Sequence, residues 1–200
     1  MTGSSKWDAL LFDFDGVLAD TERTHHVSWN AVLEPFGTQF SWDDYVKQCV
    51  GVADRVVAER LKLPEPDSVV ARKQDLFRAT LEANPPFLEE TLALVRELTQ
   101  NHRLAVVSSS YRREVEPPLL RAGILGCFEL VVCGNDVERL KPAPDPYLLA
   151  ARKLGVSQPL VIEDSDAGVA AGLAAGFEVL RVSGVGNVAS EVRERLSAPH

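Results

Sequence analysis

Short apolar runs that alternate with helical segments dominate this chain from about residue 88 onwards. Each run is four to six residues long, and the segment behind it carries apolar residues at helical spacing; the runs lie at 104–108, 130–134, 159–164 and 178–182. Strands that are apolar on both faces and separated by helices form a parallel sheet with helices on both sides. The earlier run LLF at 10–12 adds one more strand. The pattern therefore predicts an α/β fold with a Rossmann-like parallel sheet.

Residues 21–85 interrupt this alternation. Their apolar residues recur at helical spacing, and short breaks at Gly37, Gly51 and Pro64 separate the helical stretches. We therefore expect a small all-helical cap domain at 21–85, inserted into a catalytic core that is formed by 1–20 and 86–200.

The composition excludes several classes of function. The chain has 200 residues, 46% of them hydrophobic, and a formal net charge of −8. No basic stripe is present, which argues against nucleic-acid and anionic-membrane partners, and no apolar run is long enough to cross a bilayer. The polar start of the sequence and the odd number of cysteines favour a cytoplasmic protein with reduced thiols. We expect a monomer.

Two aspartates at the end of the first apolar run carry the strongest chemical signal. Asp13 and Asp15 are one residue apart in LLFDFDGVLAD, and Gly16 follows them. Two carboxylates at the end of a buried strand repel each other. Their presence there is explained by a bound cation or by a role in a reaction. The arrangement indicates a hard metal ion and an oxyanion substrate.

Polar residues stand at the ends of later apolar runs as well. Ser108 ends one run and Ser109 follows it, and Lys141 lies in a loop just before Pro142 and Pro144. Glu163 and Asp164 end the run PLVIED, where a single acid would serve as a helix N-cap but a pair favours Mg²⁺. Because ligands of open parallel sheets bind at the carboxyl ends of the strands, we expect these residues to converge.

The segments DFDGVLAD, VVSSS, KPAPD and IEDSDAG resemble the four motifs of the haloacid dehalogenase superfamily. The helical insertion behind the first motif resembles the small cap of the branch that contains phosphatases and β-phosphoglucomutase. The resemblance covers essentially the whole chain.

This resemblance implies a role for each matched residue. Asp13 would be the nucleophile that forms an aspartyl-phosphate, and Asp15 would be the general acid and then the general base. Ser108 and Lys141 would hold the transferring phosphoryl group. The resemblance further implies that Mg²⁺ is bound by Asp13, the carbonyl of Asp15, and the acidic pair, with Asp164 direct and Glu163 direct or through water.

The cap would supply substrate specificity. His25 and Trp29 are four residues apart on one helix, in a stretch that resembles β-phosphoglucomutase. The alternative is that Trp29 packs inside the cap and His25 is merely exposed. Gly51 and Arg55 lie where the family has its specificity loop. Asp54 stands where the mutase has a basic residue, and an acid there weakens the mutase interpretation because a mutase must bind a second phosphate.

The leading hypothesis is a Mg²⁺-dependent phosphomonoesterase that acts on a small phosphorylated metabolite, a sugar phosphate in the first instance. The alternative is a β-phosphoglucomutase-like isomerase that uses the same aspartyl-phosphate. A dehalogenase would leave Asp15 and the acidic pair without a purpose, and a phosphonate hydrolase would need a reactive cap lysine. A non-catalytic module would be expected to lack Asp13 or Asp15.

Overall fold

The computed structural model describes residues 6–83 and 86–198. The chain divides into two compact units. We call residues 1–20 and 87–200 the sheet unit, and residues 21–86 the helical unit. The predicted boundary after Pro85 involves a residue that lies outside the described ranges.

A parallel five-stranded sheet forms the centre of the sheet unit, in the order β3-β2-β1-β4-β5. The strands are β1 (Leu10–Phe12), β2 (Leu104–Val107), β3 (Leu130–Val132), β4 (Leu160–Glu163) and β5 (Glu178–Arg181). Leu11 is in register with Ala105 of β2 on one side and with Val161 of β4 on the other. The predicted Rossmann-like α/β core is confirmed.

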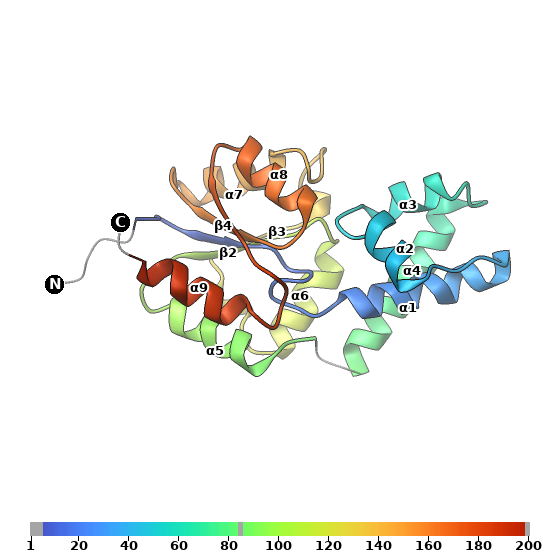
Figure 1. Cartoon of the computed structure of the whole chain (residues 1–200), viewed down its shortest axis with the longest axis horizontal. Helices are drawn as coiled ribbons and strands as arrows, with labels where there is room; N and C mark the ends of the chain where they lie inside the picture. Colours follow the sequence, from blue (N-terminus) through green and yellow to red (C-terminus); the bar gives the residue numbers. More distant parts are fainter. Residues whose placement is uncertain (1–5, 84–85, 199–200) are drawn as a thin grey trace. The chain divides into compact units, whose positions relative to one another are not determined.

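Side chains of the central strand alternate between two apolar layers, as the twofold period of a strand requires. Leu10, Phe12 and Phe14 enter one layer, whereas Ala9 and Leu11 enter the other. Figure 1 shows the sheet between two groups of helices. The first layer is covered by α5 (Glu89–Leu98), α6 (Arg112–Arg121) and α9 (Val188–Ser197), and the second by α7 (Asp145–Leu154) and α8 (Asp166–Ala174).

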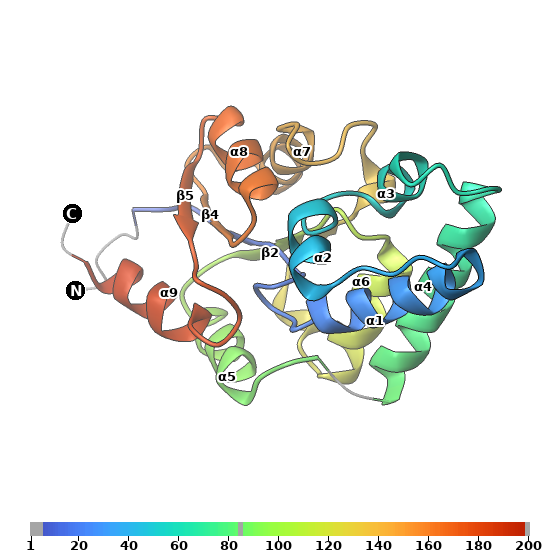
Figure 2. The ribbon, with the colours of Figure 1, turned by 45° about the vertical axis from the view of Figure 1, so that its right-hand side comes forward.

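The described part of the helical unit contains helices and no strand. Its helices are α1 (Glu22–Leu33), α2 (Trp42–Gln48), α3 (Asp54–Arg60) and α4 (Pro66–Ala83). Figure 2 shows α1 beside α4, and these two helices make the most extensive contact within the unit. Trp29, Leu33, Tyr45 and Val57 are buried together in a core that belongs to this unit alone. The predicted all-helical insertion is confirmed as part of the fold class.

The length and apolar character of the helices bear on whether one of them could cross a bilayer. Among the helices of the described ranges, none combines the length and the apolar character that crossing a bilayer requires.

Candidate active site

The order of the strands reverses between β1 and β4, and the site is built at this point. The chain runs outward from β1 to β2 and β3, and then crosses to β4 and β5 on the other side. Phe12 is in register with Ile162, and the amide of Asp13 donates to the carbonyl of Ile162 at 3.0 Å. Asp13 and the Glu163–Asp164 pair therefore leave the sheet side by side, at the place where open parallel sheets bind ligands.

Lys141 joins these acids through its ammonium group. Nζ donates to Oδ1 of Asp13 at 2.7 Å, to Oε1 of Glu163 at 2.6 Å and to the carbonyl of Val107 at 2.9 Å. These contacts use all three of its protons. The lysine is buried, so its position is set by the two carboxylates and the end of β2 rather than by solvent.

The carboxylate of Glu163 is enclosed on both sides. Oε1 also accepts from the hydroxyl of Tyr147 at 2.8 Å, and Oε2 accepts from the amides of Asp164 and Ser165 at 3.0 and 3.2 Å. A Cβ on Gly168 would lie 1.7 Å from Oε1, so this first-turn glycine of α8 makes room for the carboxylate. Ser165 is the N-cap of α8, because its hydroxyl accepts from the amide of Gly168, and neither acid is needed for that role.

A second glycine makes room for Asp164. Gly16 has a φ of +82°, and a Cβ at this position would lie 2.2 Å from Oδ2 of Asp164. Asp13, Glu163 and Asp164 each offer one carboxylate oxygen, and these oxygens lie within 4.8 Å of one another. Clustered carboxylate oxygens are the donors that a hard divalent cation prefers, so the residues present fit a metal of this class.

Electrostatics at the site point in the same direction. Burial raises the pKa of Asp13 well above its ordinary value, Glu163 and Asp164 add to this, and Lys141 opposes it. Burial by itself lowers the pKa of Lys141, but Asp13 and Glu163 outweigh it, so this pKa lies well above its ordinary value. One buried ammonium does not balance the acids, and added positive charge would hold Asp13 in its ionised form.

Asp15 faces the serines that follow β2. Ser110 donates to Oδ2 of Asp15 at 2.7 Å, and Ser108 donates to the same oxygen at 3.4 Å. Ser108 also accepts from the amide of Ser110 at 2.9 Å. Within the described residues, the buried hydroxyl oxygen of Ser109 has no hydrogen-bond partner, so an incoming oxyanion would satisfy it.

The four candidates from the insertion lie in the helical unit. Trp29 is buried in the core of that unit, and His25 on the same helix stacks on Phe77 with ring centroids 3.9 Å apart. Gly51 adopts a φ of +71° in the turn before α3. Arg55 is exposed and binds two acids of its own unit, Glu59 at 2.9 Å and Asp67.

A buried cation in the helical unit was not predicted. Lys73 is 0% exposed and donates to both carboxylate oxygens of Asp54 at 2.8 and 2.9 Å, and to Nδ1 of His25 at 2.6 Å. Because an ammonium only donates, Nδ1 of His25 is the acceptor in this pair. Asp54 is therefore the counter-ion of an internal lysine.

Comparison with known proteins identifies the family. The family described as haloacid dehalogenase-like hydrolase matches residues 10–182, which is most of the chain. This chain is a haloacid dehalogenase-like hydrolase. The resemblance to the haloacid dehalogenase superfamily that the sequence indicated is thereby confirmed.

Named relatives of this hydrolase include phosphatases. It is 32% identical to a phosphorylated carbohydrates phosphatase of Thermotoga maritima, over 89% of this chain and 85% of that protein. It is 31% identical to the fructose-1-phosphate phosphatase YqaB of Escherichia coli, over 88% of this chain and 97% of that protein. The crystal structure of CbbY from Rhodobacter sphaeroides in complex with phosphate superimposes with a TM-score of 0.80, at 26% identity, over 89% of this chain and 87% of that one. The relatives confirm the predicted enzyme class, a phosphatase of this family.

Two residues at the site of this hydrolase were not predicted from the sequence. Tyr147 occupies a position of α7 whose spacing indicates only a core side chain, and Ser110 is the last of a run of three serines. The signal in the sequence was weak for both: Ser110 is the last residue of VVSSS, and Tyr147 lies two residues after KPAPD. Which partner each would meet depends on tertiary packing.

Proposed function

We propose that this hydrolase removes phosphate from a small phosphorylated carbohydrate, with Asp13 as the nucleophile. One observation carries the proposal: a buried lysine contacts Asp13 at 2.7 Å at the switch point of a parallel sheet, where Asp13 forms a carboxylate cluster with Glu163 and Asp164. A phosphate ester and a carboxylate repel each other, and a fixed cation together with a metal site offsets that repulsion.

The first half-reaction forms an aspartyl-phosphate. Asp13 attacks the phosphorus, the bond between phosphorus and the ester oxygen breaks, and Asp15 gives its proton to the departing alcohol. Lys141, which already donates to Asp13, Glu163 and the carbonyl of Val107, would balance the charge of the phosphoryl oxygens beside Asp13. Ser108 and Ser109 offer hydroxyl groups to the same phosphoryl group, and the partnerless hydroxyl of Ser109 supports this assignment.

The second half-reaction releases inorganic phosphate. Water attacks the phosphorus of the aspartyl-phosphate, one proton of the water passes to Asp15, and the bond to Asp13 breaks. Asp13 is then ionised and Asp15 protonated, as they were at the start. Asp15 thus acts once as an acid and once as a base, in agreement with its position beside Asp13 in the loop that follows β1.

Mg²⁺ is the proposed cofactor. Asp13, Asp164 and the carbonyl of Asp15 would hold it, and it would supply positive charge next to the nucleophile and the phosphate. Glu163 already accepts hydrogen bonds on both oxygens, which favours a contact through water for this residue.

Substrate recognition is assigned to the helical unit as a cap. We assign this role to four residues of the helical unit: His25, Trp29, Gly51 and Arg55. Asp54 supports hydrolysis over a mutase reaction, because it stands where the mutase has a basic residue. Its carboxylate is bound to Lys73. The names of the two phosphatases described above support a phosphorylated carbohydrate as the substrate.

The test is phosphate release from a panel of sugar phosphates and small phosphorylated acids, in Mg²⁺ and in EDTA. We expect release in Mg²⁺ only, and loss of release in Asp13→Asn. The same samples are assayed for conversion of β-glucose 1-phosphate to glucose 6-phosphate with a sugar bisphosphate activator. Isomerisation with little phosphate release would replace the proposal by the mutase, and full activity of Asp13→Asn would refute the nucleophile.

A further inference from the structure

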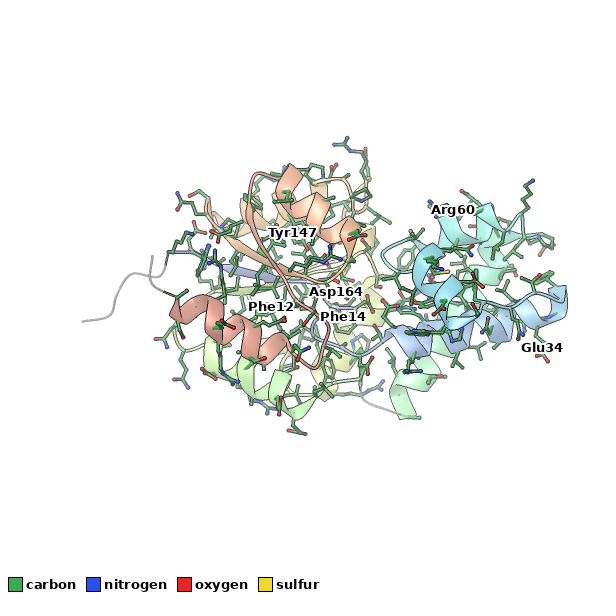
Figure 3. The ribbon with its side chains drawn as sticks, viewed as in Figure 1. Phe12, Phe14, Glu34, Arg60, Tyr147 and Asp164 are labelled. Carbon is green, nitrogen blue, oxygen red and sulfur yellow. The ribbon has the colours of Figure 1, made fainter. Side chains whose placement is uncertain are left out.

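Tyr147 places a buried hydroxyl next to the catalytic charges, and the reaction outlined above makes no use of it. The side chain is 0% exposed and belongs to the apolar layer beneath α7. Figure 3 shows it on the α7 side of the sheet, with Phe12 and Phe14 on the other side. Phenylalanine would fill the same layer without a polar atom. A buried hydroxyl is costly unless it is hydrogen-bonded, so the acceptor of this hydroxyl is informative.

That partner is Oε1 of Glu163, the oxygen that also binds Lys141. The hydroxyl lies 2.8 Å from Oε1, and the ammonium lies 2.6 Å from it. Two donors on one carboxylate oxygen occupy both of its lone pairs. The other oxygen is held by the backbone amides of Asp164 and Ser165 and by the hydroxyl of Ser165, just before α8. The carboxylate of Glu163 therefore has a fixed orientation, and the tyrosine hydroxyl completes it.

The lysine is held in turn by this carboxylate. Lys141 has three acceptors, one of which is Asp13, and its ammonium lies 4.9 Å from the centroid of the Tyr147 ring. The tyrosine thus contacts both members of the Lys141–Glu163 pair, one through its ring and the other through its hydroxyl. A shift of Glu163 would move the ammonium relative to the nucleophile.

We propose that Tyr147 is a positioning residue whose hydroxyl fixes Glu163 as the partner of Lys141 and thereby keeps the ammonium at Asp13. The inference rests on the proposed function, because it gives the Lys141–Asp13 contact a role in phosphoryl transfer. Without the hydroxyl, Oε1 keeps only the ammonium as a donor, and the carboxylate is held less firmly at the oxygen that faces Lys141. Positioning errors of this kind reduce the rate of the chemical step rather than the affinity for substrate.

The principal experiment compares Tyr147→Phe with Tyr45→Phe. Tyr45 is a matched control, since it is also buried and donates to a carboxylate, Oε2 of Glu22 at 2.5 Å, within the helical unit. For Tyr147→Phe we expect kcat to fall about tenfold, the cost of one hydrogen bond to a charged group, with KM and the half-saturating Mg²⁺ concentration changed less than about twofold. Tyr45→Phe should retain the wild-type kcat. Equal kcat values in both variants would overturn the proposal.

A double-mutant cycle tests the route through Glu163. In the Glu163→Gln background, Tyr147→Phe should lower kcat by less than about twofold, because the carboxylate it acts through is gone. A full additional loss in that background would overturn the proposed route. If Glu163→Gln does not fold, as judged by thermal unfolding, the comparison with Tyr45→Phe still decides.

A metal-free measurement separates this inference from the proposed function. In ¹⁵N-labelled protein, the ammonium signal of Lys141 is identified by its absence from Lys141→Met. Tyr147→Phe should shift this signal or accelerate its proton exchange, and an unchanged signal would overturn the inference. A wild-type chain that releases no phosphate would refute the proposed function, while the ammonium signal would still report on Tyr147.

Discussion

The hydroxyl of Ser110 donates to Oδ2 of Asp15 at 2.7 Å, which links the loop after β2 to the proposed acid and base. Ser108 lies farther from the same oxygen, at 3.4 Å, and its hydroxyl accepts from the amide of Ser110. Ser108, one of the proposed phosphate-binding serines, therefore forms one hydrogen-bonded group with Ser110 and the proposed proton carrier Asp15.

Ser110→Ala should lower kcat by about threefold to tenfold, because the carboxylate of Asp15 loses the shorter of its two serine contacts. Steady-state kinetics on the best substrate of the panel would measure this. Ser190→Ala is the control, since the hydroxyl of Ser190 donates to the carbonyl of Asn187 at the start of α9 and Ser190 lies outside the site motifs. A Ser110→Ala variant with wild-type kcat would show that this contact does not assist Asp15.

Gly168→Ala should destabilise the chain and reduce activity together. The added Cβ would overlap Oε1 of Glu163, and the carboxylate cannot move away without breaking its contact with Lys141. We expect the free energy of unfolding to fall by about 1–3 kcal/mol, the usual cost of overpacking. Chemical denaturation measures this.

Gly126→Ala is the matched control for that variant. No described atom lies within 4 Å of a Cβ at Gly126, so its unfolding midpoint should stay close to that of the wild type. Comparable midpoints for the Gly126 and Gly168 variants would contradict the tight contact with Glu163.

The pH dependence of stability without metal should report on Asp13. Its pKa in the folded chain is raised by burial and by neighbouring acids, so above its ordinary pKa of about 4 the folded chain binds more protons than the unfolded chain. The contribution of Asp13 to stability therefore decreases as the pH rises from that value to the raised pKa. Each unit of raised pKa changes the unfolding equilibrium about tenfold.

Denaturation in EDTA at a series of pH values tests this sign. Asp13→Asn has no proton to release, so its stability should gain on the wild type as the pH rises. Saturating Mg²⁺ should reduce the difference, since bound cations favour the ionised carboxylate. A difference between the two chains that does not vary with pH would contradict the direction given for Asp13.

The sequence predicted the sheet and the convergence of the motifs at one edge of it. Short apolar runs indicate strands, and the polar residues that follow them indicate where the strands end. The sequence did not predict which side chains contact one another at the site and within the helical unit. Tyr147 shares the spacing of an ordinary core residue, and its hydroxyl reaches Glu163 only through the packing of α7 on the sheet. Lys73 has no suggestive neighbours in the sequence, and only the packing of α1, α3 and α4 brings Asp54 and His25 to its ammonium.

Two neighbouring residues of α3 should therefore differ sharply in their effect on stability. Asp54→Ala leaves the fully buried ammonium of Lys73 without its carboxylate, and we expect the free energy of unfolding to fall by about 3–5 kcal/mol. Arg55→Ala removes two solvent-exposed ion pairs and should leave the denaturation midpoint almost unchanged. The double variant Asp54→Ala with Lys73→Met should recover part of the loss, because no buried charge then lacks a partner. Equal midpoints for the two single variants would show that Lys73 does not depend on Asp54, and the argument that Asp54 serves as an internal counter-ion would fail with it.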